Sequence, residues 1–325
     1  MIAQATIPPV HWTVWAGFVA CVLLFLALDL GVFHRESHVV KFKEAFAWTL
    51  VWFALAMCFA GALVPWRGKQ DAVEFVTGYV IELSLSMDNV FVIALIFAYF
   101  RVPPQFQHRV LFWGILGALV MRGVVIGLGT GLVARFAWTL YVFGAFLVYS
   151  GAKMLFADDE GVHPEKNPLI KLAQKLYPVS HGFEGQKFVT RLNGRRALTP
   201  LALTLVMVET SDLVFALDSI PAIFAVTTKP FIVFTSNVFA ILGLRSLYFV
   251  LAGAIQYFHF LKYGLSLVLV FIGVKMLIDP HDQPAKWFQL EIPTGLSLAV
   301  VASIIVLAIL FSVVMAKREK HSQPS

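Results

Sequence analysis

Nine apolar stretches, each close in length to the hydrocarbon core of a lipid bilayer, dominate the sequence. A membrane-spanning helix needs about 20 predominantly apolar residues. The stretches cover residues 12–33, 45–66, 75–100, 110–132, 136–156, 201–226, 231–255, 263–278 and 293–316. Only 14% of the residues are charged, whereas soluble domains carry about 25%, so a water-exposed fold and a disordered chain are both excluded. We therefore predict an all-α, polytopic membrane protein with about nine transmembrane helices.

The basic residues predict how these helices are oriented. Of the 25 Lys and Arg residues, 17 fall on the loops and tail of one side of the membrane and 5 on the other. Because loops rich in Lys and Arg stay in the cytoplasm, we expect the amino terminus outside and the carboxyl terminus in the cytoplasm. The formal net charge of +6 is then explained by the orientation of the helices and by contacts with membrane lipids. We therefore expect no nucleic-acid partner.

Charged landmarks recur in the same order on either side of the polar segment 157–199. Asp88-Asn89 is matched by Asp218-Ser219, Leu-Val-Met-Arg122 by Leu-Gly-Leu-Arg245, and Gly151-Ala-Lys-Met-Leu by Gly273-Val-Lys-Met-Leu. Short strings rich in Leu and Gly can match by chance. The shared order of the Asp, Arg and Lys landmarks nevertheless favours an internal repeat.

The repeat divides the chain into five parts. Residues 1–74 form two peripheral transmembrane helices, 75–156 the first three-helix repeat, 157–199 a cytoplasmic loop, 200–279 the second three-helix repeat, and 280–325 the ninth helix with a basic tail. Because each repeat has three spans, the two enter the membrane from opposite sides and are inverted. Inverted repeats are typical of secondary transporters, whose substrate site lies near the bilayer midplane between the repeats.

The cytoplasmic loop contains one amphipathic segment. Apolar residues of 169–177 fall on one face of a short helix, with Lys171 and Lys175 on the other. Such a helix is typical of a connector, and it also has the composition to lie on the inner leaflet.

Carboxylates inside the membrane are the strongest functional signal. Five of them lie in the opening helices of the two repeats: Glu82, Asp88, Glu209, Asp212 and Asp218. A charged side chain at the bilayer centre costs at least about 2.5–3.5 kcal/mol, so these groups need protons, counter-ions or a bound cation. Arg122 and Arg245 in the following helices are candidate counter-ions, but two arginines do not neutralise five carboxylates.

The segments around these acids supply oxygen donors and lack His and Cys. The neighbouring donors are Ser84, Ser86, Asn89, Thr210, Ser211 and Ser219. Hard oxygen ligands favour magnesium, calcium or manganese over zinc or copper. Met87, beside Asp88, is either a packing residue or a softer ligand that helps to select manganese over magnesium.

The spacing of the acids imposes a condition on their helices. Glu82 and Asp88 project about 120° apart on a regular helix, and Glu209 and Asp218 face opposite ways. The opening helices must therefore be buried on all sides or be interrupted. Pro221 favours an interruption in the second of them, because proline has no amide hydrogen for the carbonyl four residues back.

Two strings carry a resemblance to a known family. They are Glu82-Leu-Ser-Leu-Ser-Met-Asp88-Asn89-Val and Glu209-Thr-Ser-Asp212-Leu-Val-Phe-Ala-Leu-Asp218-Ser219-Ile-Pro221-Ala-Ile-Phe. They resemble the paired signatures of the TerC family, most closely its Alx branch, and the similarity extends over about residues 12–316. The resemblance implies a bacterial inner-membrane protein that exports manganese. The metal-site residues that it implies are Glu82, Asp88, Asn89, Glu209, Asp212, Asp218 and Ser219.

Three classes of function follow from these features. An exporter of divalent cations uses the surplus of acids directly, with manganese as the transported ion, no permanently bound cofactor and protons as the coupling ion. The resembling family also has members associated with membrane-protein assembly, so a membrane assembly or interaction factor is the alternative. An intramembrane aspartyl protease is disfavoured because its Gly-x-Gly-Asp arrangement is missing, and we do not expect an enzyme.

Overall fold

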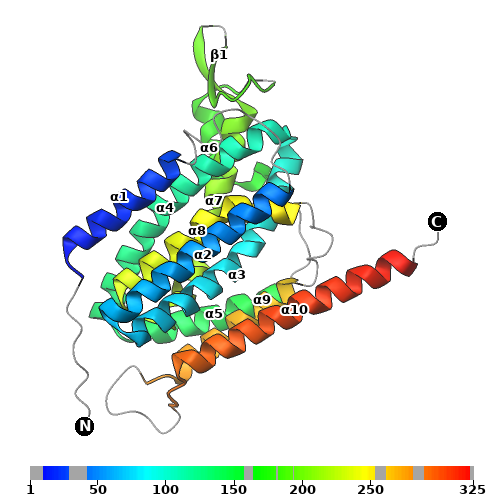
Figure 1. The fold of residues 1–325 in the computed structure, drawn as a ribbon. Helices are drawn as coiled ribbons and strands as arrows, with labels where there is room; N and C mark the ends of the chain where they lie inside the picture. Colours follow the sequence, from blue (N-terminus) through cyan, green and yellow to red (C-terminus); the bar gives the residue numbers. More distant parts are fainter. Residues whose placement is uncertain are drawn as a thin grey trace.

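Long helices make up most of the structure, a computed structural model that describes residues 10–28, 42–156, 164–180, 182–192, 194–252, 261–280 and 289–322. A small two-stranded sheet stands beyond one end of the helices (Figure 1). The long helices are α1 (Trp12–Leu28), α2 (Phe42–Arg67), α3 (Lys69–Phe100), α4 (Pro104–Arg135), α5 (Thr139–Phe156), α7 (Pro200–Phe224), α8 (Pro230–Ala252), α9 (Leu261–Ile278) and α10 (Thr294–Ser322).

The described helices confirm the prediction of an all-α, polytopic membrane protein. Eight of them, α2 to α5 and α7 to α10, are long and apolar enough to cross a bilayer, and α1 is a shorter apolar helix. The predicted extension of the first span to residue 33 lies outside the described residues. Because every backbone group in a helix bonds within the same segment, helices satisfy the bilayer's demand for internal hydrogen bonding.

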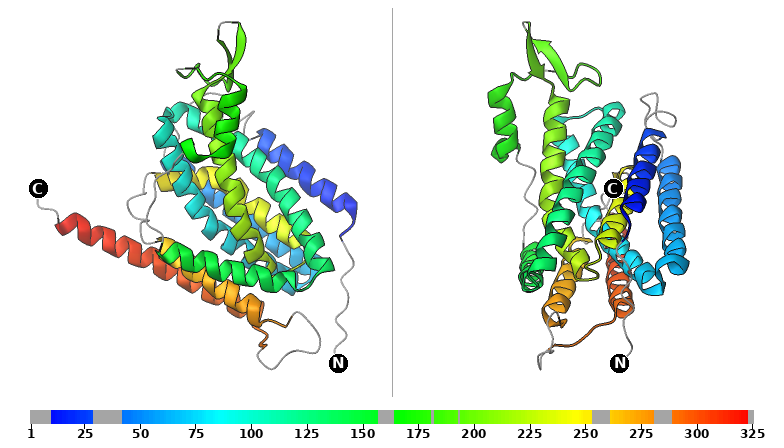
Figure 2. Two further views of the ribbon diagram at one scale, coloured as in Figure 1. Left: turned by 180° about the vertical axis from the view of Figure 1, so that it is seen from behind. Right: turned by 90° about the vertical axis from the view of Figure 1, so that its left-hand side faces the viewer.

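Helices from the two predicted repeats pack against each other rather than forming separate bundles. The main pairs are α5 with α9, α3 with α8, α3 with α7 and α4 with α7. Figure 2 shows α5 and α9 running side by side along one edge of the bundle. If α3 is exchanged with α7, α4 with α8 and α5 with α9, the same four pairs result. An inverted repeat would require this symmetry. The repeat itself stays a prediction.

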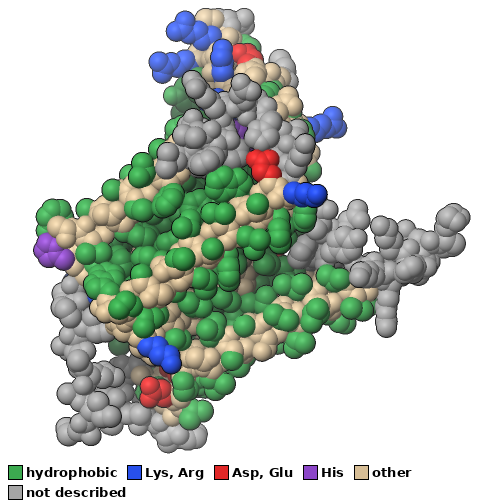
Figure 3. Space-filling model, in the orientation of Figure 1, with side chains coloured by type: hydrophobic (Ala, Val, Ile, Leu, Met, Phe, Trp, Pro, Cys, Tyr) green, Lys and Arg blue, Asp and Glu red, His purple; other side chains and the backbone are tan. Residues whose placement is uncertain are grey.

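The outer flank of the bundle is apolar, as a surface in contact with lipid should be. Figure 3 shows hydrophobic side chains along the helices and Lys and Arg gathered at the end that carries the small sheet. Leu128 of α4 and Leu307 of α10 are 71% and 65% exposed. Large exposed apolar surfaces are unusual on soluble monomers, so this flank agrees with a bilayer environment.

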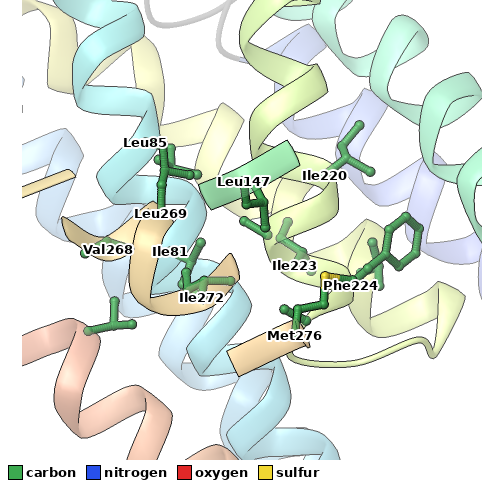
Figure 4. Close-up of a cluster of buried hydrophobic side chains, with 14 of the residues drawn as sticks. Ile81, Leu85, Leu147, Ile220, Ile223, Phe224, Val268, Leu269, Ile272 and Met276 are labelled. Carbon is green, nitrogen blue, oxygen red and sulfur yellow. The ribbon is translucent and has the colours of Figure 1, made fainter. Parts of the chain in front are cut away.

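A cluster of buried apolar side chains joins helices of both halves. It contains Ile81 and Leu85 of α3, Leu147 of α5, Ile220 of α7 and Leu269 of α9 (Figure 4). The cluster therefore packs α3 and α7, which carry the acids, against the α5–α9 pair.

The predicted interruption of the acid-bearing helices is wrong. Helices α3 and α7 are continuous, and α7 includes Pro221 without a break. Pro221 stands in the last turn of α7, close to its end at Phe224, so the lost backbone hydrogen bond disturbs little of the helix. The other alternative holds for α3, because α2, α7, α8 and α10 all pack around it.

The predicted amphipathic helix of the loop is present as α6 (Pro168–Leu176). Asn167 begins it, because its side-chain oxygen accepts hydrogen bonds from the backbone amides of Leu169 at 2.9 Å and Ile170 at 3.2 Å. Such an N-cap satisfies donors that the first turn leaves without partners. The Ile170 side chain is buried, whereas Leu169 and Leu172 are exposed.

The small sheet was not expected. Strand β1 (Val189–Leu192) pairs with β2 (Arg195–Leu198) in an antiparallel hairpin. The two strands are separated by Asn193-Gly194 in the sequence, the dipeptide typical of tight hairpin turns that need positive φ. Gly194 has φ of 79°, so this dipeptide was a usable signal.

The contact between α5 and α9 depends on glycine. A Cβ on Gly273 of α9 would lie 2.8 Å from both the carbonyl oxygen of Gly144 and the backbone nitrogen of Val148 on α5. A Cβ on Gly127 of α4 would have no neighbouring atom within 4 Å. Only the first position requires the absence of a side chain.

We predict that Gly273→Ala forces α5 and α9 apart and lowers the free energy of unfolding by about 1–3 kcal/mol. Gly127→Ala is the matched control, and it should be neutral or stabilising by about 0.5–1 kcal/mol, because alanine suits a helix better than glycine. Thermal unfolding of both purified variants in detergent measures the difference. Equal melting temperatures for the two variants would contradict the prediction.

Candidate cation-binding site

A small cavity lies between α3 and α7 and holds four of the predicted site residues. Asp88 and Asn89 line it from α3, and Asp218 and Ser219 line it from α7. Its volume is about 50 Å³. The cavity is completed by Leu85, Met154, Phe215 and Leu269.

Two polar atoms at this cavity are buried without a hydrogen-bond partner. They are Oδ1 of Asp218 and Oδ1 of Asn89. Buried polar atoms in proteins are nearly always hydrogen-bonded or bound to an ion. The donor set of two carboxylates, an amide oxygen and a hydroxyl therefore fits a hard divalent cation.

Arg122 of α4 joins two other predicted site residues in a buried ion-pair cluster. The guanidinium, only 1% exposed, donates from Nη2 to Oδ1 of Asp212 at 2.8 Å and from Nε to Oδ2 at 3.2 Å. Its Nη1 forms an ion pair with Glu82. A two-pronged Arg–carboxylate pair fixes orientation as well as charge, so Arg122 holds α3 and α7 at a set distance.

The Arg122 cluster and the cavity share two residues. Asn89 donates from Nδ2 to Oδ1 of Asp212 at 3.4 Å, and Ser219 Oγ accepts from Arg122 Nη1 at 3.4 Å. Both Asn89 and Ser219 also line the cavity. Two polar contacts, both 3.4 Å long, therefore link the cavity to the Arg122 cluster.

The remaining predicted residues lie elsewhere. The Glu209 carboxylate on α7 covers Gly117 of α4, where a side chain would overlap it, and its charge interacts with that of Asp212. Arg245 is buried on α8. Within the described ranges, no three Asp, Glu, His or Cys side chains form a cluster that could hold a metal ion.

Helix α5 contributes residues to the site that the sequence reasoning missed. Met154 lines the cavity, and the Ser150 hydroxyl forms a hydrogen bond with Asp218. Met154 belongs to the repeated Gly-x-Lys-Met landmark, which was a signal for its importance. Met87 instead packs against the apolar cluster around Ile93, so Met154 is the methionine that lines the cavity.

A second ionic cluster ties the start of α3 to the loop before α8. Lys229 donates from Nζ to Asp71 at 2.6 Å and to Glu74 at 3.0 Å, and Arg67 donates from Nε to Asp71 at 2.6 Å. Burial of Lys229 disfavours its charge, but its hydrogen bonds to both carboxylates and their negative charge outweigh that effect and raise the pKa of Lys229. The cluster closes the end of the bundle opposite the hairpin.

The sequence matches the integral membrane protein TerC family over residues 67–320. The chain belongs to the TerC family. This match covers both acid-bearing helices and Arg122. No solved structure matches the chain.

Relatives of this TerC protein match over nearly their whole length. A membrane protein of Myxococcus xanthus, described as uncharacterised, is 51% identical over 309 residues, which are 95% of this chain and 94% of the relative. The Alx protein of Escherichia coli K12, provisionally described as a membrane-bound redox modulator, is 45% identical over 92% of this chain and 93% of its own. A membrane protein of Rickettsia felis is 38% identical over 94% of this chain and 99% of its own.

We predict that Arg122→Met destabilises this TerC protein by about 3–5 kcal/mol, because it leaves Glu82 and Asp212 buried without their counter-charge. Arg135→Met, at the exposed end of the same helix, is the matched control and should change stability by less than about 0.5 kcal/mol. Thermal unfolding in detergent measures both.

A compensated variant distinguishes the loss of charge balance from a loss of packing. Adding Glu82→Gln and Asp212→Asn to Arg122→Met removes the unpaired charges, so it should recover most of the lost stability. If Arg122→Met were as stable as Arg135→Met, the buried cluster would not be what holds α3 and α7 together.

Proposed function

We propose that the chain is a secondary transporter that exports divalent metal cations, above all manganese, through the cavity between α3 and α7. The observation that carries this proposal is the pair of aspartates, Asp88 and Asp218, which line one small cavity from two different helices. Two carboxylates there need neutralisation, because isolated charges within a membrane are costly. One divalent cation supplies it.

The size and chemistry of the cavity suit a cation. A cavity needs about 10–15 Å³ to hold one water molecule, so a cavity of about 50 Å³ has room for one ion together with a few waters. Oxygen ligands suit magnesium, calcium and manganese. The thioether of Met154 adds one softer donor, which favours manganese over magnesium among these ions.

The Arg122 cluster supports a mechanism of alternating access. Arg122 of α4 binds Glu82 of α3 and Asp212 of α7, and these acids belong to the two predicted repeats. Rearrangement of this cluster lets α3 and α7 move relative to each other and exposes the cavity to one side at a time. In the proposed cycle the carboxylates load metal from the cytoplasm, and protonation from the outer side promotes its release.

The proposal includes a location. We place the chain in the bacterial inner membrane, as its membership of the TerC family suggests. From the distribution of Lys and Arg we infer that the amino terminus lies outside and the carboxyl terminus in the cytoplasm. The loop that carries α6 and the hairpin then faces the cytoplasm. The end closed by the Lys229 cluster faces outward.

We predict that Asp88→Asn and Asp218→Asn each reduce manganese transport at least tenfold without lowering the amount of folded protein, because each removes a ligand charge and keeps the side-chain volume. Manganese flux into proteoliposomes measures transport. Glu291→Gln, which removes an exposed acid outside the membrane helices, is the control and should transport normally.

Other results would change the proposal. If both Asn variants moved manganese like the parent protein, or if the parent moved none, a membrane assembly or interaction factor would become the better explanation. Transport indifferent to a pH gradient would remove proton exchange from the cycle. Thermal stabilisation by manganese but not by magnesium, calcium or zinc would support the proposed selectivity, since a ligand stabilises the state that binds it.

The redox description of the Alx relatives suggests a thiol-based alternative. The two cysteines of this chain, Cys21 of α1 and Cys58 of α2, are free and exposed. The Cys21→Ser, Cys58→Ser double variant separates the two functions. Full manganese transport by that variant supports the transporter, and loss of transport on substitution of the cysteines favours the thiol-based alternative.

A further inference from the structure

We propose that the β1–β2 hairpin carries a binding site for an anion that bears phosphate groups. This site is separate from the cavity between α3 and α7 and does not depend on the proposed transport. The hairpin stands beyond the helix ends (Figure 1), and Figure 3 shows Lys and Arg side chains gathered there. The topology rule accounts for basic residues on this side of the membrane, but not for how they are paired.

The register of the hairpin places two arginines directly opposite each other. Arg191 of β1 pairs with Arg196 of β2, so both side chains stand on the same face of the sheet. Like charges at directly opposed positions destabilise a strand pair. Arg195 pairs with Leu192 and lies on the other face.

Contacts with the rest of the protein prevent the strands from separating to relieve this repulsion. The backbone amide of Ser180 donates to the carbonyl of Leu198 at 2.8 Å, and that of Thr199 donates to the carbonyl of Phe188 at 3.0 Å. The guanidinium of Arg109, at the start of α4, lies over the Phe188 ring at 5.2 Å. The backbone positions of the two opposed arginines are therefore fixed before any ligand arrives.

An open cavity of about 430 Å³ lies beside these arginines. It is lined by Lys187, Val189, Thr190, Arg191 and Arg196. Three of these five side chains are cationic. One carboxylate lies nearby, that of Glu184, which accepts a hydrogen bond from Thr190. It does not balance the three cationic side chains, so the cavity keeps an excess of positive charge.

The size and charge of the cavity define the class of ligand. Pockets for small molecules usually measure about 300–1,000 Å³, so this one exceeds the needs of a single inorganic ion. Guanidinium groups match phosphate oxygens in two-pronged hydrogen bonds. A phosphate-bearing anion can be a soluble polyphosphate compound or the headgroup of an anionic lipid, and the hairpin offers the same chemistry to both.

The test measures binding of inorganic pyrophosphate and of ATP to the full-length protein in neutral detergent by isothermal titration calorimetry. The parent protein should bind at least one of them. The Arg191→Gln, Arg196→Gln double variant should bind at least tenfold more weakly. The matched control, Arg195→Gln, removes a charge from the opposite face and should change the affinity less than threefold.

Thermal unfolding without added anion provides a readout that does not depend on the choice of ligand. Because the double variant relieves the repulsion between the arginines, it should unfold at the same temperature as the parent or higher. A double variant that unfolds at a lower temperature would show that the arginines stabilise the hairpin, and would overturn the proposal.

A second set of titrations, in lipid nanodiscs, distinguishes the two sources of phosphate. The titration is repeated in nanodiscs of phosphatidylcholine alone and with phosphatidylglycerol added. Weaker pyrophosphate binding in the anionic discs assigns the site to lipid headgroups, and equal binding assigns it to a soluble anion. No binding to the parent in detergent or in either disc, or an equal loss with Arg195→Gln, would overturn the proposal.

Discussion

One guanidinium group in the middle of the bundle connects the helices on which the rest of the structure depends. Arg122 binds Glu82 of α3 and Asp212 of α7, and it is almost completely buried. Without this positive charge, two carboxylates would stand unpaired at a depth where water is scarce, at a cost that no single apolar contact offsets. Together with the apolar cluster around Leu85 and Ile220, this side chain sets the position of α3 against α7 and therefore the cavity between them.

The Arg122 cluster and the cavity divide four of the five membrane acids into two groups with different tasks, and Glu209 belongs to neither. Glu82 and Asp212 occupy corresponding positions in the predicted repeats, and both form ion pairs with Arg122. Asp88 and Asp218 also correspond, and both face the cavity. The two halves thus contribute one structural acid and one cavity acid each, and Asn89 and Ser219 connect the two levels.

The spans and the membrane acids could be predicted from the sequence, because hydropathy and the cost of buried charge both act on single residues or short stretches. Which acid contacts Arg122 and which faces the cavity could not, since that depends on how α4 packs against α7. Met154 was missed because α5 reaches the cavity through its packing against α7 and α9, which the sequence does not show. The hairpin was overlooked although Asn193-Gly194 signalled it. The expected break at Pro221 did not occur, and only three residues of α7 follow this proline.

The glycine contact between α5 and α9 has a mechanical consequence. Gly144 and Gly273 bring two backbones together, and the side chains of Leu277 and Val148 lie over these glycines from the opposite helix. The seam therefore resists rotation as well as separation. We expect α5 and α9 to move as one rigid pair, so that any displacement between the two halves of the bundle takes place at the contacts of the other helices.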